Sequence, residues 1–82
     1  MHEYSLARDL VNRAAVEAES QGASRVVRMT IAVNRNGHPD PEALRFNLRA
    51  AASGTVVAGA DFRLIPATGQ GVVLESIELE EV

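Results

Sequence analysis

Apolar residues recur at spacings of three and four along residues 4–21, and most charged residues fall on the opposite face of the implied helix. This is the period of an amphipathic α-helix. Asp9 stands four residues before Arg13, an orientation that supports a helix, and Gly22 follows where a left-handed residue would end it. The stretch therefore predicts a first helix with one buried stripe. That stripe comprises Leu6, Leu10, Val11, Ala14, Ala15 and Ala18.

A second helix is predicted after the polar loop at residues 34–38. Asp40 fits the N-cap of this helix and Pro41 its first position, and residues 53–54 end it. Phe46 is expected to flank the buried stripe. The stripe itself comprises Ala43, Leu44, Leu48, Ala51 and Ala52.

Three stretches have a period of two and are predicted to be strands: residues 25–33, 55–65 and 72–82. Gly59 is expected to mark a bulge or a close approach within the second strand, and Pro66 to end its pairing. These stretches supply the sheet that the two helices need as a partner for their apolar stripes.

The short segment at residues 67–71 contains two glycines and is expected to be a turn, so the last two strands most simply form a hairpin. The element order is helix-strand-helix-strand-strand. We therefore predict an α+β fold in which two helices pack on one face of a small three-stranded sheet, in a single domain spanning residues 1–82.

Composition narrows the possible functions. The 82 residues include 8 Lys plus Arg against 11 Asp plus Glu, a net charge of -3, so no basic face for nucleic acid is expected. The chain has no cysteine, which excludes disulfides and thiolate metal sites. No apolar run has the length of a membrane span, so a cytoplasmic protein that does not enter membranes is expected.

The start of the chain carries its most distinctive chemistry. The α-amine of Met1, the deprotonated amide of His2 and the His2 imidazole can close fused rings around one divalent metal, with the amide of Glu3 or another donor completing a plane. Tetragonal nitrogen donors favour Ni²⁺ or Cu²⁺ over Zn²⁺. The alternative is that His2 is an ordinary surface residue near a frayed terminus. His38 is more simply a solvated loop residue, although it could add a donor if its loop folds back.

The other reactive residues have plain structural explanations. The acidic residues near the end of the chain are expected to form a solvent-facing strand that discourages edge pairing. They are Glu75, Glu78, Glu80 and Glu81. No serine lies in a glycine-framed elbow with a base, so an enzyme is not expected.

Three stretches of the sequence, together with the order of elements, resemble the HypA/HybF family of nickel metallochaperones, which act in NiFe-hydrogenase maturation. They are the opening Met1-His-Glu-Tyr-Ser-Leu6, the run Pro-Asp-Pro-Glu-Ala-Leu-Arg-Phe at residues 39–46, and Gly54-Thr55 with Gly59-Ala60. The opening Met-His-Glu matches the family's nickel-binding signature. The resemblance covers nearly the whole chain and implies a Ni(II) site formed by the Met1 amine, the His2 imidazole and the amides of His2 and Glu3.

The chain departs from the family in two places. Family members carry a zinc domain held by two Cys-x-x-Cys pairs between the last two strands, whereas residues 67–71 occupy that position here without a cysteine, so no zinc is expected. The loop at residues 34–38 also lacks the Gly-Glu-Leu pattern usual in the family.

The resemblance implies a non-enzymatic protein that carries Ni(II) as transient cargo. Its implied partners are a HypB-type GTPase and the hydrogenase large subunit. The alternative is a HypA-like interaction module, or an accessory subunit, that kept the fold and no longer delivers metal. The oligomeric state stays open, because a short turn at residues 67–71 could favour exchange of the last strand between chains.

Overall fold

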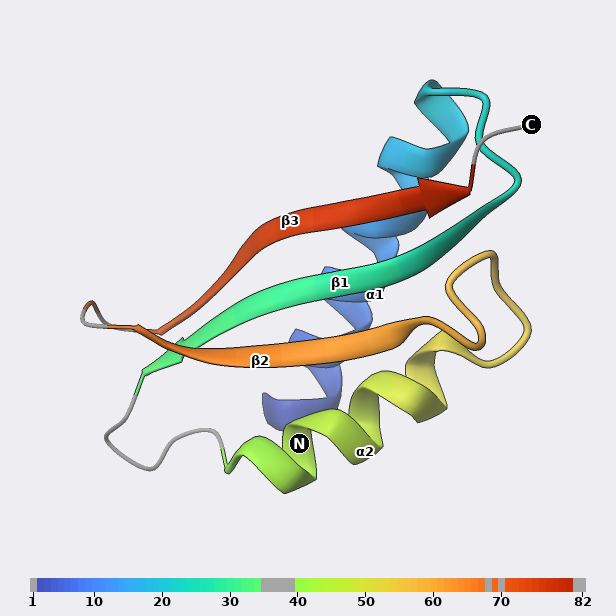
Figure 1. Cartoon of the computed structure of the whole chain (residues 1–82). Helices are drawn as coiled ribbons and strands as arrows, with labels where there is room; N and C mark the ends of the chain where they lie inside the picture. Colours follow the sequence, from blue (N-terminus) through green and yellow to red (C-terminus); the bar gives the residue numbers. More distant parts are fainter. Residues whose placement is uncertain (1, 35–39, 68, 70, 81–82) are drawn as a thin grey trace.

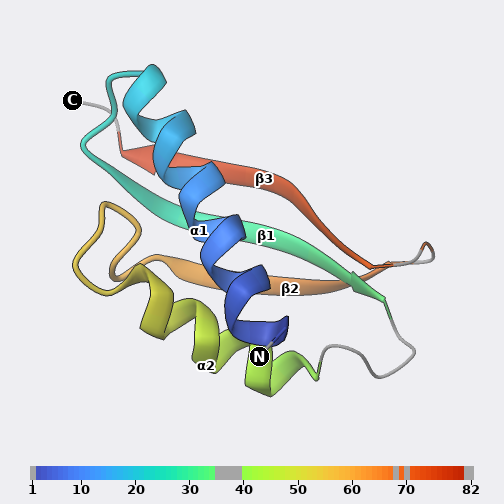
Figure 2. The same ribbon diagram turned by 180° about the vertical axis from the view of Figure 1, so that it is seen from behind.

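Five elements follow one another in the predicted order of helix, strand, helix, strand, strand (Figure 1). The computed structural model describes residues 2–34, 40–67, 69 and 71–80. The elements are α1 (His2–Ser20), β1 (Arg25–Asn34), α2 (Pro41–Ala52), β2 (Asp61–Ala67) and β3 (Val72–Glu80). The predicted α+β class is thereby confirmed, with both helices on one face of a three-stranded sheet (Figure 2).

Local signals set the ends of both helices as the sequence indicated. Gly22 follows α1 with a φ of 69°, a left-handed conformation that glycine adopts without steric cost. At the start of α2, a side-chain oxygen of Asp40 accepts from the amide of Glu42, and Pro41 occupies the first turn. The predicted cap and stop signals are therefore confirmed.

The strand order is β2-β1-β3, so the predicted hairpin between the last two strands is wrong. β2 pairs parallel with β1 and β3 pairs antiparallel with it, on opposite edges of β1. The parallel pairing requires a crossover, which α2 supplies. This arrangement gives β1 hydrogen-bonding partners on both sides. β1 is also the most deeply buried of the three strands.

The predicted start of the second strand is also wrong, because β2 begins at Asp61 and residues 53–60 form turns. The Thr55 hydroxyl donates to the carbonyl of Ala52 at 2.7 Å and accepts from the amide of Val57 at 3.0 Å. Gly59 does not make a strand bulge; it has a φ of 82° within this turn segment. Val57 of this segment is fully buried in the core, whereas Val56 is 41% exposed and its carbonyl accepts from the amide of Val26 at 2.9 Å.

Pro66 does not end the pairing of β2, contrary to the sequence-based expectation. It is paired in register with Val33, and the strand continues to Ala67, which is opposite Asn34. Proline lacks an amide hydrogen, but on an edge strand that position can face away from the neighbouring strand. The order of the sheet, which places β2 at an edge, therefore explains why the proline is tolerated.

The core lies between the two helices and the covered face of the sheet (Figure 2). It comprises Ala7, Leu10, Val11, Ala14 and Ala18 from α1, Val26, Met29, Ile31 and Val33 from β1, Leu44, Leu48 and Ala52 from α2, and Val57 and Phe62. Phe46 does not flank this core as expected, because it is 73% exposed. Leu44 and Leu48 are fully buried, and a residue midway between them points to the opposite side of a helix with 3.6 residues per turn.

Neither α1 nor α2 covers the other face of the sheet (Figure 1). On it, Arg28 of β1 lies between Asp61 of β2, at 3.3 Å, and Glu78 of β3, at 2.9 Å. Arg25 also pairs with Glu80. The described acidic residues of β3 are exposed, which confirms their predicted solvent-facing role; Glu81 lies outside the described residues.

Candidate metal site

The sequence-predicted metal site falls at the first turn of α1. His2 is the first residue of the helix and Glu3 the second. Met1, and the side chains of His2 and Glu3, lie outside the described part of the structure, and so does His38. Of the three predicted ligand residues, the structure describes the backbone of His2 and Glu3.

The position of these two residues at the helix start suits ligation by backbone nitrogen. The first four amides of an α-helix have no carbonyl partner within the helix. The amides of His2 and Glu3 are among these, because α1 begins at His2. Deprotonation of either amide by a metal would consequently break no hydrogen bond inside the helix. An amide located one turn further along the helix would donate a hydrogen bond to a helix carbonyl. Its deprotonation by a metal would therefore cost that hydrogen bond.

The start of α1 is also accessible. Tyr4 is 42% exposed and Ser5 is exposed, and Ala7 is the first residue of the helix that is fully buried. The N-terminal end of α1 lies beside α2 (Figures 1 and 2). A ligand held at residues 1–3 would therefore sit at the surface next to α2, and another protein could reach it.

No second cation site emerges from the rest of the described chain. Among the described residues, no group of three or more His, Cys, Asp or Glu side chains is placed to hold a metal ion. Nor does any helix in that part have the length and apolarity needed to cross a membrane.

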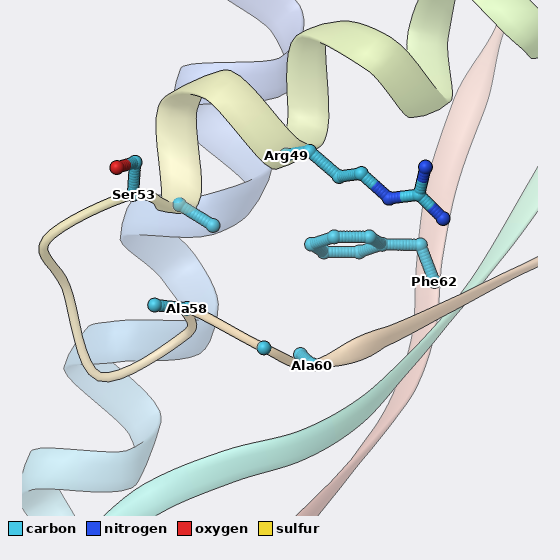
Figure 3. A pocket seen from close by; sticks show the side chains of 7 residues that line it. Arg49, Ser53, Ala58, Ala60 and Phe62 are labelled. Atoms are coloured by element: carbon cyan, nitrogen blue, oxygen red, sulfur yellow. The ribbon is translucent and has the colours of Figure 1, made fainter.

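The structure reveals one feature that sequence reasoning missed, a cavity at the end of α2 (Figure 3). Arg45 and Arg49 are one helical turn apart, and both lie near Phe62 of the neighbouring strand β2. Arg45 Nη2 donates to the Phe62 carbonyl at 3.2 Å, and Arg49 lines the cavity together with the Phe62 ring. Two arginines four residues apart on one predicted helix were a signal that could have drawn attention to this face.

The described residues form a small α+β fold whose first helix begins at His2 and is exposed at Tyr4 and Ser5. A family described as "Hydrogenase/urease nickel incorporation, metallochaperone, hypA" matches residues 1–77. The chain belongs to the HypA family. This is a family of metallochaperones and not of enzymes, in agreement with the sequence-based expectation.

Similar proteins include several named hydrogenase maturation factor HypA. The one from Chlorobium limicola is 39% identical over 61 residues, covering 74% of this chain and 53% of that protein. The one from Methanosarcina mazei is 34% identical over 70 residues, covering 83% of this chain and 51% of that protein. For Dechloromonas aromatica the identity is 31% over 78 residues, and the coverages are 95% and 69%. The chain thus spans about half the length of the first two relatives.

A solved structure confirms the fold independently of these sequences. The solution structure of the Ni metallochaperone HypA from Helicobacter pylori superposes with a TM-score of 0.85 at 12% identity, covering 98% of each chain. At this identity the likeness concerns the fold alone.

Proposed function

We propose that this chain is a nickel-carrying domain for hydrogenase maturation that holds Ni(II) at its amino terminus. The ligands are the Met1 amine, the His2 imidazole and the backbone amides of His2 and Glu3. The observation that carries this proposal is the start of α1 at His2, which leaves both amides without helical partners. Membership of a family described by nickel incorporation supports the choice of metal.

The chemistry of these donors accounts for both capture and release. Nitrogen donors in a plane suit Ni(II), and binding requires loss of protons from the amine, the imidazole and the amides. Nickel should therefore bind more weakly as the pH falls. Because the proposed donors lie at the start of a helix whose next residues, Tyr4 and Ser5, are exposed, a partner with competing ligands could displace them one at a time.

The implied partners belong to this proposal as well. We propose that a HypB-type GTPase and a hydrogenase large subunit receive or regulate the nickel, in the cytoplasm. Only residues 68–71 separate β2 from β3, and the chain has no cysteine. This supports the proposal that a short turn stands where other family members carry a zinc domain, and that zinc takes no part here.

The absence of lysine from the sequence makes a sharp test possible, because the α-amine is then the sole primary amine of the 82-residue chain. Acetylation with an amine-selective reagent would modify Met1 and leave other nitrogen donors intact. Calorimetric titration of Ni(II) would compare untagged protein, acetylated protein and His2→Ala. We expect one-to-one binding, micromolar or tighter, in the untagged protein and a large loss in both modified forms.

The matched control is a charge-removing change remote from the site, Arg25→Gln at the start of β1, which should bind nickel as the parent protein does. Full nickel binding by the acetylated protein would contradict the proposed ligands. No binding by the untagged protein would favour the alternative, in which the fold serves as an interaction module without metal delivery.

A further inference from the structure

A cavity of about 460 Å³ opens between the end of α2, the turn segment at residues 53–60 and the start of β2 (Figure 3). It is lined by Arg49, Ala52, Ser53, Ala58, Gly59, Ala60 and Phe62, all of them within the described part of the chain. Its walls are mostly small apolar side chains and one aromatic ring. Its one charged lining residue is Arg49.

The positive charge of Arg49 is not neutralised by a carboxylate among the described residues. Within the described residues its guanidinium has no ion pair or hydrogen bond, whereas Arg28 is bound by two carboxylates and Arg45 by a carbonyl. Figure 3 shows the aliphatic stem of Arg49 lying over the Phe62 ring, with the guanidinium beyond the ring. Phe62 is only 5% exposed, so its ring gives the Arg49 stem a fixed apolar surface to pack on. The donor groups of Arg49 are therefore positioned and available.

The helix end beside the cavity does not oppose an anion strongly. The C-terminal carbonyls of a helix carry partial negative charge when they lack partners. Here the carbonyl of Ala52 accepts from both the amide and the hydroxyl of Thr55, at 3.0 and 2.7 Å. The carbonyl of Ala50 accepts from the amide of Ser53 at 3.4 Å. These bonds satisfy the two carbonyls, and Arg49 is the one charged side chain among the residues that line the cavity.

We propose that this cavity docks an acidic segment of a protein partner, with a carboxylate side chain on Arg49 and a small apolar side chain against Phe62 and Ala60. An exposed arginine–carboxylate pair is too weak by itself to retain a free anion. The apolar walls supply the further contact, which requires a ligand that has an apolar residue beside its carboxylate. A peptide segment meets both conditions, and a guanidinium can bind its carboxylate in a bidentate manner.

The test uses the full metal-free chain, so its result does not depend on the proposed nickel site. The probes are a blocked peptide, acetyl-Ala-Val-Glu-Ala-Leu-amide, and its counterpart with Gln in place of Glu. Backbone amide signals are followed by nuclear magnetic resonance as each peptide is added. We expect the acidic peptide to shift the signals of residues 58–62 and to bind about two- to fivefold more tightly than the Gln peptide.

Three variants complete the experiment. Arg49→Gln should abolish the preference for Glu over Gln, whereas Arg63→Gln, a change on β2 outside the cavity lining, should keep it. Ala58→Leu should narrow the cavity and weaken both peptides, which tests the site without touching its charge. Equal binding of the two peptides, shifts confined to other elements, or an unchanged preference in Arg49→Gln would overturn the proposal.

Discussion

Arg45 Nη2 of α2 donates to the carbonyl oxygen of Phe62 at 3.2 Å. This hydrogen bond links α2 to β2, which lies at an edge of the sheet. Edge strands present unpaired backbone groups, and this one is partly covered by a helix side chain. Arg45→Met should lower the free energy of unfolding by about 1–2 kcal/mol, because a charge-assisted hydrogen bond is lost while helix propensity is kept. Urea unfolding would measure it. The control is Arg13→Met, at an exposed position of α1, which should change the free energy of unfolding by less than about 0.5 kcal/mol. Equal losses of stability in the two variants would show that the hydrogen bond between Arg45 and Phe62 does not stabilise the fold.

Leu48 is fully buried where α2 meets the core. Leu48→Ala should cost about 2–5 kcal/mol, because truncation removes buried apolar area and leaves a cavity. In a domain of this size that is a large part of the total stability. Val16, which is 64% exposed on α1, supplies the matched control, since Val16→Ala should leave stability within about 0.5 kcal/mol. Chemical denaturation of the two variants side by side would show whether burial decides the difference.

Gly59 has a φ of 82° and open space where the Cβ of a larger residue would lie, so its backbone conformation alone sets the cost of substitution. Gly59→Ala should destabilise by about 1–2 kcal/mol, the penalty of a left-handed conformation for an L-residue. For a domain this small, each 1 kcal/mol corresponds to a decrease in Tm of about 4–8 °C. Gly69, which also has open space but no positive φ, should tolerate alanine without loss. A similar decrease in both variants would remove the conformational explanation.

Glu3 contributes its backbone amide to the proposed nickel site, so its side chain should matter less than that of His2. Glu3→Gln keeps the amide and should weaken nickel binding less than His2→Ala, which removes the imidazole. Calorimetry of both variants at one pH would rank them. Equal losses would implicate the Glu3 carboxylate directly and would require a revised ligand set.

Helix signals in this chain are strong because they are local. The N-cap at Asp40, Pro41 in the first turn and Gly22 after α1 each act within a few residues, and each has its predicted role in the structure. The same helical period could have predicted that Phe46 is exposed, because Leu44 and Leu48 define the buried side of the helix. The proposed N-terminal site could be recognised because its donors are consecutive in the sequence.

The strand errors arose where the outcome depends on distant residues. The apolar and β-branched residues before Asp61 fit a strand by composition. The segment instead forms turns, which are stabilised by the hydrogen bonds of Thr55 and by the left-handed conformation of Gly59. A hairpin was the simplest connection for adjacent strands with a short turn, yet strand order is set by which edges of β1 remain free. Neither the turns before Asp61 nor the strand order can be predicted from a short stretch of sequence.

The sequence by itself determined the two amphipathic helices, the order of the five elements and the proposal of nitrogen donors at residues 1–3, because periodicity, capping and chelate spacing are properties of neighbouring residues. Only the tertiary structure decided that β1 is central, that β2 is an edge strand able to accept Pro66, and that Arg49 and Phe62 meet at a cavity. These relationships join residues from separate elements. They depend on how the crossover through α2 packs against the sheet. Contacts between residues that are distant in the sequence produce no periodic pattern of apolar and polar residues from which they could be predicted.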